Sequence, residues 1–185
     1  MAKNKEIKKQ WASVISTREF GNTELAEIPY TDVKTLIGRV LRVNLYLLTN
    51  DSRKQNAEIA FKIINSDGKT ANTELMGYKI LNAYVKRVIR KGKEKVDDSF
   101  SCESRDRVKI KVKPFFITKN KTSNSIVTKL RQHTRQIMTE YSKSTDFERI
   151  VKDITSNFLQ KNIKQELKKI YPLNLFELRE LSRTK

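Results

Sequence analysis

The most constraining feature of this chain is a pair of apolar stretches joined by a tight-turn sequence. Residues 57–64 and 69–76 each have the composition of a strand, and an Asn-Ser-Asp-Gly sequence at residues 65–68 separates them. The Asp-Gly pair supplies the positive φ angles that a tight hairpin requires. The two stretches are therefore predicted to pair as an antiparallel hairpin.

Other segments alternate apolar and polar residues in the same way. Residues 36–48 carry apolar side chains at period two, which predicts a strand, and residues 49–52 then predict a turn. Pro114 removes a ladder donor, so it predicts an edge position or a bulge in its strand. Besides residues 36–48, strands are predicted at residues 96–103, 107–117 and 173–181.

Helical spacing occupies the rest of the chain. Residues 79–91 predict an amphipathic helix that ends at Gly92. Residues 124–142 predict a second helix, and the Thr-Asp-Phe-Glu sequence at 145–148 predicts a capping box that opens a third. A further helical segment ends before Pro172. Strands, helix, strands, helices and strand in this order predict an α+β domain with a mainly antiparallel sheet or barrel and helices gathered at one side.

The N-terminus differs from the rest. Residues 1–10 carry four lysines and one acid, so they are predicted to form a basic arm, with residues 11–185 as a single domain. Trp11 begins that domain and has two interpretations. It stacks on an RNA base, or it packs on the domain as an apolar anchor; the second is favoured because its apolar surface is large.

Net charge is the strongest functional signal. The chain has 39 Lys and Arg against 21 Asp and Glu, a formal charge of +18. Such a charge repels itself unless a polyanion neutralises it, which favours a nucleic-acid partner over a generically basic surface or a lipid surface. The longest apolar run is too short to span a bilayer and no signal peptide opens the chain, so we expect a cytoplasmic protein without a membrane partner.

Five basic clusters supply the candidate RNA-binding residues. Arg87 and Arg90 are the best candidates for specific contacts, because a guanidinium can fork onto phosphate or stack on a base. The lysines at 164, 168 and 169 are interpreted as a solvated face. The candidates are Lys5, Lys8 and Lys9; Arg39, Arg42, Arg53 and Lys54; Lys86, Arg87, Arg90, Lys91, Lys93 and Lys95; Lys109 and Lys111; and Lys119, Lys121, Lys129, Arg131 and Arg135.

Nothing in the sequence favours catalysis. His133 is the only histidine and Cys102 the only cysteine, too few for a zinc site. Asp97-Asp98 is interpreted as a solvated turn, and Cys102 as a small residue in or beside a strand. We therefore expect no enzyme activity, no metal and no cofactor. An RNA-processing enzyme or another nucleic-acid-binding protein remains the alternative to a structural RNA-binding protein.

Four motifs occur in order along the chain: residues 11–15 with 20–21 and 24–29; residues 36–40 with 45, 48 and 49; residues 84–91; and residues 169–173. Together they resemble the motifs of the S-three-Ae family of small-subunit ribosomal proteins, also called e-type S-one. The resemblance covers most of the chain, and the short C-terminus is similar to that of archaeal members. The sequence departs from the family at Leu175-Phe176, where family members tend to be polar and then β-branched.

The resemblance implies a β-barrel-like core flanked by helices and a structural role in the ribosome. It implies binding to small-subunit rRNA on the platform, near the mRNA exit side and the 3′ end of that rRNA. Neighbouring platform proteins are the implied partners, and mRNA is a further candidate partner. The basic helix of the family corresponds to Lys86, Arg87, Arg90 and Lys91.

Overall fold

The hairpin predicted from the Asp-Gly turn is the central ladder of the fold. In the computed structural model, which describes residues 9–184, β4 (Ala57–Ser66) pairs antiparallel with β5 (Thr70–Ile80). Gly68 in the turn has a φ of +86°, and the Asp67 N–H donates to the Thr70 carbonyl at 3.0 Å. The prediction is confirmed, with the turn at residues 67–69 and both strands longer than expected.

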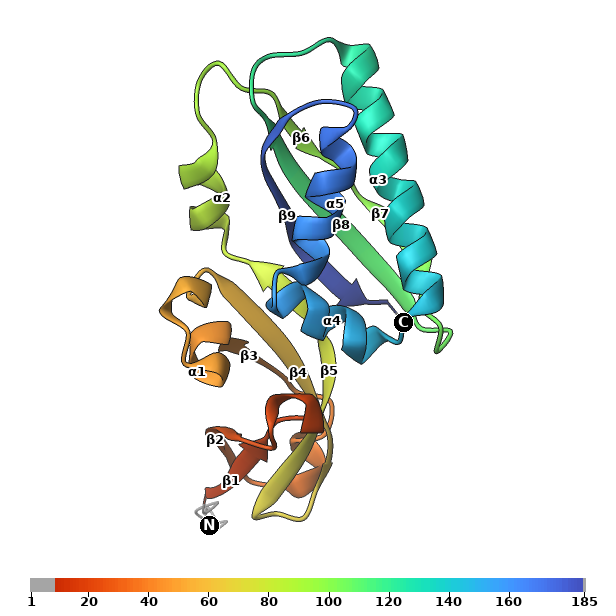
Figure 1. The fold of residues 1–185 in the computed structure, drawn as a ribbon. Coiled ribbons are helices and arrows are strands. Elements are labelled where there is room, and N and C mark those ends of the chain that lie inside the picture. The colour runs from red at the N-terminus through yellow and green to blue at the C-terminus, as the bar shows by residue number, and fades with distance from the viewer. Residues whose placement is uncertain (1–8, 185) are drawn as a thin grey trace, which may run out of the picture.

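Figure 1 shows the remaining described elements, with the turn of this hairpin at the lower end of the molecule. The other strands are β1 (Gln10–Ile15), β2 (Glu24–Tyr30), β3 (Val40–Asn44), β6 (Lys95–Asp97), β7 (Phe100–Glu103), β8 (Lys109–Thr118) and β9 (Leu173–Arg183). The α-helices are α1 (Leu45–Thr49), α2 (Asn82–Val88), α3 (Asn124–Ser144), α4 (Phe147–Thr155) and α5 (Phe158–Lys168). Three short 3-10 helices are η1 (Arg18–Phe20), η2 (Val33–Thr35) and η3 (Ser52–Lys54).

The sheet is open and branches at β5. The first half of β5 pairs in parallel with β1, and its second half pairs antiparallel with β9. On the other side β5 pairs with β4, which carries β3, while β9 continues to β8 and then to β6 and β7. The expected barrel-like core is therefore wrong, because among the described residues β2 and β3 remain edge strands instead of closing on each other. The α+β class and the mainly antiparallel pairing are confirmed.

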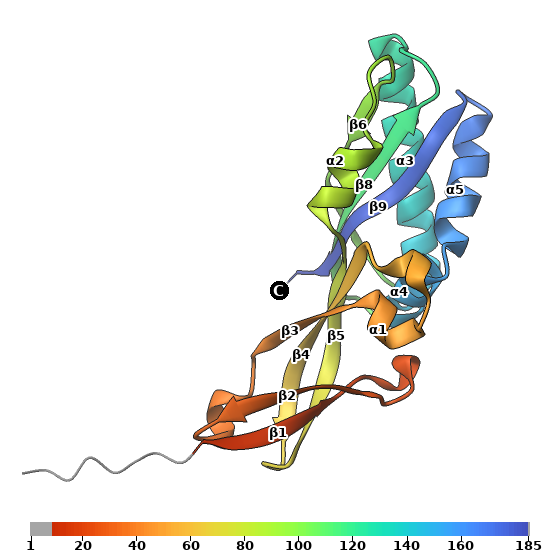
Figure 2. The ribbon, with the colours of Figure 1, turned by 90° about the vertical axis from the view of Figure 1, so that its left-hand side faces the viewer.

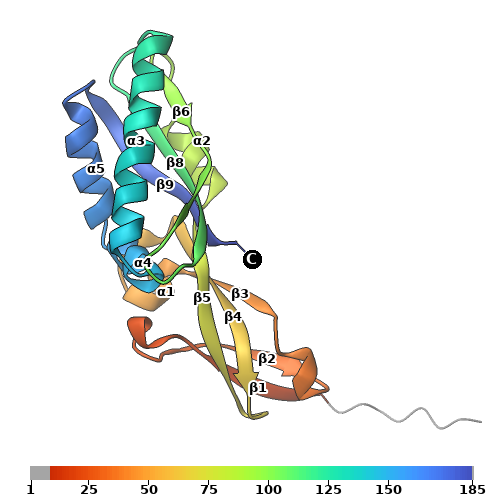
Figure 3. The ribbon, with the colours of Figure 1, turned by 90° about the vertical axis from the view of Figure 1, so that its right-hand side faces the viewer.

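Helices cover the two faces of the sheet unequally. In Figures 2 and 3, α3 and α5 lie on one face of β8 and β9, and α2 lies on the opposite face. Ile110 and Val112 of β8 are fully buried in the main core, together with Leu130 and Met138 of α3. The strand residues that alternate with this core therefore point to the face that α3 and α5 leave uncovered.

The predicted strand at residues 36–48 is much shorter than expected. Only Val40–Asn44 forms β3, and α1 follows at once. The Asn44 side chain caps this helix by accepting the Tyr46 N–H at 3.0 Å, and Asn50 ends it in the left-handed conformation with a φ of +52°. Leu45 is buried whereas Leu47 is 65% exposed, so the period-two prediction fails beyond residue 44.

Two further boundaries also differ from the predictions. β5 extends to Ile80, so α2 begins later than expected; it ends at Val88, because Ile89 is already extended. Gly92, with a φ of +82°, therefore lies in the following loop and does not stop the helix. The strand expected at 96–103 is two short strands, β6 and β7, which both pair with β8.

The last strand, β9, returns to the sheet as predicted, and its pairing with β5 and β8 gives its register. β9 lies between β5 and β8, with Phe116 opposite Phe176. These two rings stack with centroids 6.1 Å apart, so the departure at residues 175–176 places an aromatic side chain in the core. Pro114 lies at a register shift between β8 and β9, which confirms the predicted bulge.

The helix after residue 145 is capped differently from the prediction. Asp146 is its N-cap, and no capping-box bond forms; instead the Phe147 N–H donates to the Asp106 carboxylate at 3.0 Å. The capping group thus comes from the loop between β7 and β8. The unpaired backbone N–H groups at a helix N-terminus can be satisfied by an acceptor from a distant residue just as they can by one from a neighbouring residue.

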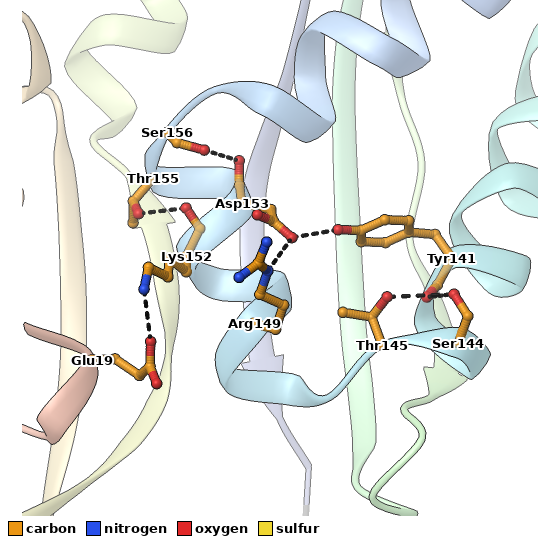
Figure 4. Close-up of polar contacts among 9 residues, drawn as sticks. All are labelled: Glu19, Tyr141, Ser144, Thr145, Arg149, Lys152, Asp153, Thr155 and Ser156. Atoms are coloured by element: carbon orange, nitrogen blue, oxygen red, sulfur yellow. Dashed lines mark hydrogen bonds and ion pairs between the residues drawn. The ribbon is translucent and has the colours of Figure 1, made fainter.

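Polar contacts hold α4 against its neighbours (Figure 4). The Tyr141 hydroxyl of α3 donates to Asp153 at 2.5 Å, and burial together with this bond raises the pKa of Tyr141 to about 12. Lys152 forms an ion pair at 3.3 Å with Glu19 of η1. The helical layer is thereby connected both to α3 and to the N-terminal strands.

Candidate RNA-binding surface

Nearly all the candidate cations lie at the surface. Lys5 and Lys8 of the predicted arm lie outside the described residues, while Lys9 is exposed and Gln10 already begins β1. Lys54 and Lys93 are half-buried. The exposed candidates are Lys9, Arg39, Arg42, Arg53, Lys86, Arg87, Arg90, Lys91, Lys95, Lys109, Lys111, Lys119, Lys121, Lys129, Arg131 and Arg135.

The uncovered face of the sheet brings cations from distant segments together. Opposite residues on neighbouring strands share a face, and one such row crosses six strands. Small residues occupy the middle of the row, with Arg42 near one end and Lys111 near the other. The row consists of Arg42, Ala60, Gly77, Ser182, Lys111 and Ser101.

Close strand packing explains why the middle of this row is flat. A Cβ on Gly77 would lie 2.2 Å from the Leu181 carbonyl oxygen, so only glycine allows β5 and β9 to approach this closely. A shallow concavity of about 280 Å³ lies over the part of the row from Arg42 to Ser182, and its other lining residues include Val40, Met76, Glu58 and Glu180. We call this surface, from Arg42 to Lys111, the open sheet face. It is smooth, and cations lie on both sides of its centre.

A neighbouring cation was missed by the sequence analysis. Lys62 of β4 shares the outward face with Ala60, because β4 alternates these residues with buried Phe61 and Ile63. It lines a hollow that Lys109 also lines. The signal for Lys62 was present in the sequence, because the period-two pattern of residues 57–64 places it on the polar face of the predicted strand.

The α2 segment places further cations on the same side of the sheet as the open sheet face (Figure 2). Lys86 and Arg87 are in the last turn of α2, and Arg90 and Lys91 follow it in non-helical chain. Arg87 lies over the Tyr84 ring at 5.6 Å and donates to the Asn56 side chain at 3.2 Å. Its guanidinium is therefore positioned by the protein.

Some candidates are already neutralised within the chain. Arg135 makes two 2.6 Å hydrogen bonds to Asp98, which hold the pKa of that carboxyl below its ordinary value. Lys95 pairs with Asp97 at 2.5 Å. The Asp97-Asp98 pair, interpreted from sequence as a solvated turn, thus acts as a counter-ion for neighbouring cations.

The candidates on α3 are separated from the others. Lys129 and Arg131 are exposed on the helix that covers the core side of β8. Figures 2 and 3 place α3 on the opposite face of the sheet from α2. A single straight RNA segment cannot contact both sets, so the five clusters form at least two separate surfaces.

Comparison with known proteins decides the family. The sequence pattern described as the Ribosomal S3Ae family matches residues 1–185. The chain belongs to this family. A relative from Nanoarchaeum equitans, named small ribosomal subunit protein eS1, is 32% identical over 184 residues, which cover 97% of this chain and 93% of the relative. Proteins of the same name from Methanothermobacter thermautotrophicus and Saccharolobus solfataricus are 31% and 28% identical, covering 92% and 95% of this chain and 87% and 85% of those relatives.

The resemblance to the S3Ae family drawn from the sequence is thereby confirmed. The first motif falls on β1, η1 and β2, and the second falls on the segment from η2 to β3 and on α1. The third falls on the α2 segment and the fourth on the junction between α5 and β9. Trp11, in the first motif, is 61% exposed. The favoured interpretation of Trp11 as a packed anchor is wrong, since its neighbour Ala12 takes the buried position on β1.

The residues considered for catalysis occupy ordinary positions. Cys102 is in β7, where burial raises the pKa of its thiol, and its Sγ lies 3.3 Å from the Ser142 hydroxyl, to which it donates. His133 is half-buried on α3. Across residues 9–184 no cluster of three acids, histidines or cysteines with metal-binding geometry is present. Over the same residues, none of the helices combines the length and apolar character that crossing a membrane would need.

Proposed function

We propose that this chain is a structural protein of the small ribosomal subunit that binds small-subunit rRNA. The observation that carries the proposal is family membership combined with cations gathered on one side of the sheet. The open sheet face and the α2 segment would form one phosphate-binding surface. The flat centre of the open sheet face would let a backbone approach closely between Arg42 and Lys111.

Electrostatics support this assignment. A chain with a net charge of +18 gains most from a partner that carries its own negative charge. If the protein contacts six to ten phosphates, raising the salt concentration from 50 to 200 mM would lower its affinity for RNA by a factor of roughly 10³–10⁵. Lys86, Arg90, Lys91 and Lys109 form no ion pair within residues 9–184, so they remain available for such contacts.

The finer parts of the proposal follow from the family resemblance. We place the protein on the platform of the small subunit, near the mRNA exit side, with neighbouring platform proteins as partners. The α3 surface carries Lys129 and Arg131. It would contact either a neighbouring protein or an rRNA segment other than the one bound by the open sheet face. This division follows from their positions on opposite faces of the sheet.

A filter-binding series with small-subunit rRNA at increasing salt tests the proposal. The double variant Arg42→Glu with Lys111→Glu should weaken binding, and it should reduce the salt slope by about two, roughly one for each phosphate that is no longer neutralised. The matched control is Lys161→Glu with Lys168→Glu, which makes the same change in net charge at exposed positions of α5.

Two outcomes would count against the proposal. Salt-independent or absent rRNA binding by the unaltered protein would contradict the function itself. Equal weakening by both double variants would show that total charge, and not the open sheet face, determines binding.

A further inference from the structure

A small pocket opens where several segments of the chain meet, away from the open sheet face. Its walls include Arg53 of η3, Asn56, Tyr84 of α2, Asn157 between α4 and α5, and Glu177 of β9. Apolar residues complete the walls, and the pocket has a volume of about 90 Å³. Sites for whole small molecules are usually about 300–1,000 Å³, so this pocket fits only part of a larger ligand.

The carboxylate of Glu177 lies in this pocket, half-buried and without a hydrogen-bond or ion-pair partner among residues 9–184. Burial raises the pKa of Glu177 to about 7, and the only opposing influence is the charge of Lys164 on α5. No hydrogen bond contributes to that pKa. The other titratable and charged groups in the pocket are Tyr78 on β5, Tyr84 on α2, and Arg53 and Lys54 on η3. This carboxylate is half-buried and has no donor among residues 9–184, so it is incompletely hydrated and the site favours a ligand that brings hydrogen-bond donors to it.

The pocket walls near α2 and η3 have the opposite character. Arg53 and Lys54 line the pocket, and Arg87 lies over the Tyr84 ring while bonding to Asn56. These cations disfavour an entering lysine or arginine side chain, even though Glu177 alone would accept one. They favour a ligand with donors at its inner end and negative charge at its outer end.

An unpaired nucleotide has this polarity. Bases in single-stranded RNA present their Watson–Crick edges to proteins, stack on aromatic side chains and carry phosphates next to them. The pocket would admit the base edge, while Tyr84 borders the ring and the cations hold the flanking phosphates. This inference rests on the proposed RNA-binding function and goes further by naming the nucleotide.

We propose that this pocket binds the Watson–Crick edge of an extruded guanine in RNA, with Glu177 accepting from its N1–H and N2–H₂ groups. Guanine is favoured because it presents two adjacent donors, which match the two oxygens of an ionised carboxylate. Adenine and cytosine each present one amino donor beside a ring acceptor, and that acceptor would face a carboxylate oxygen. Uracil presents a single donor between two carbonyls.

The test uses short oligouridylates that differ only at one central nucleotide. Guanosine, inosine and adenosine are compared at pH 8, where Glu177 is ionised, by fluorescence anisotropy of labelled RNA. Inosine lacks the N2 amino group, so it loses one charge-assisted hydrogen bond and should bind about tenfold or more weakly than guanosine. Adenosine should bind no better than inosine.

Two variants separate the pocket from general RNA binding. Glu177→Gln keeps the shape of the side chain but should abolish the preference for guanosine. Glu103→Gln makes the same charge change on exposed β7 and should retain the preference. Circular dichroism confirms that both variants are folded.

The outcomes also distinguish this inference from the proposed function. Equal affinity for the three oligouridylates, or a guanosine preference that persists in Glu177→Gln, would overturn the guanine site. Salt-dependent rRNA binding that survives in either case would leave the proposed function standing. Failure of the unaltered protein to bind both rRNA and the oligouridylates would refute both.

Discussion

The half-buried carboxylate of Glu177 gives this protein a pH dependence that a single substitution should remove. An ordinary glutamate has a pKa of 4.5, and burial raises the pKa of Glu177 to about 7. A pKa difference of one corresponds to about 1.4 kcal/mol, so the ionised folded state is penalised by at most about 3.5 kcal/mol relative to the unfolded chain. Lys164 already offsets part of the cost of burial.

The direction follows from proton binding. Between pH 4.5 and about 7 the folded state holds a proton on Glu177 that the unfolded chain has released, so this group lowers the free energy of unfolding as pH rises. Below that range the group is protonated in both states, and above it the full penalty is present. Glu177→Gln has no proton to lose, so its stability relative to the unaltered protein should increase by about 2–3 kcal/mol from pH 4.5 to pH 8.

Urea unfolding at several pH values, followed by circular dichroism, measures this difference. Fluorescence of Trp11 is a poor probe, because this side chain is 61% exposed in the folded state. Other carboxyls also contribute to the pH profile. Hydrogen bonding from Arg135 lowers the pKa of Asp98, and the contribution of this carboxyl cancels in the comparison because both proteins share it. Parallel pH profiles for the two proteins would refute the assignment of a raised pKa to Glu177.

Two other substitutions test features of the fold. Asp106→Ala removes the acceptor for the Phe147 N–H and should lower the free energy of unfolding by roughly 0.5–2 kcal/mol. Thr145→Ala should leave the free energy of unfolding nearly unchanged, because Thr145 makes no capping-box bond. If urea unfolding ranked the two variants in the reverse order, the capping box at residues 145–148 would be the true cap. Gly77→Ala places a methyl group against the Leu181 carbonyl and should destabilise by about 1–3 kcal/mol or more, with loss of amide protection in β9; wild-type stability would contradict the close approach of these strands.

Much of the secondary structure could be read from local patterns. The Asp-Gly turn requires positive φ, and both flanking stretches have strand composition, so the β4–β5 hairpin was predictable from adjacent residues. The long apolar stripe of α3 and the strand after Pro172 were also correct. The prediction of one strand at 36–48 was wrong because the Asn44 side chain caps a helix there. A single short polar residue within an apolar run does not by itself indicate a helix N-terminus.

The candidate site was only partly predictable. The sequence identified the cations, because charge and family motifs are local properties. It could not show that Arg42 and Lys111 share one face while Lys129 and Arg131 lie on the other, since that depends on register across several strands. It also gave no reason to single out Glu177, which reads as a polar residue alternating along a strand.

The sequence alone determined the net charge and the local elements of this protein: an excess of cations, carried by a chain with enough apolar residues to fold. Tertiary structure decided where those charges lie, which residue caps α4 and which carboxylate lines the pocket. The physical reason is distance in the chain. Turns and the apolar stripes of helices depend on neighbouring residues, and net charge depends on composition alone. The Asp106 cap, the six-strand row and the Glu177 pocket each bring together segments far apart in sequence.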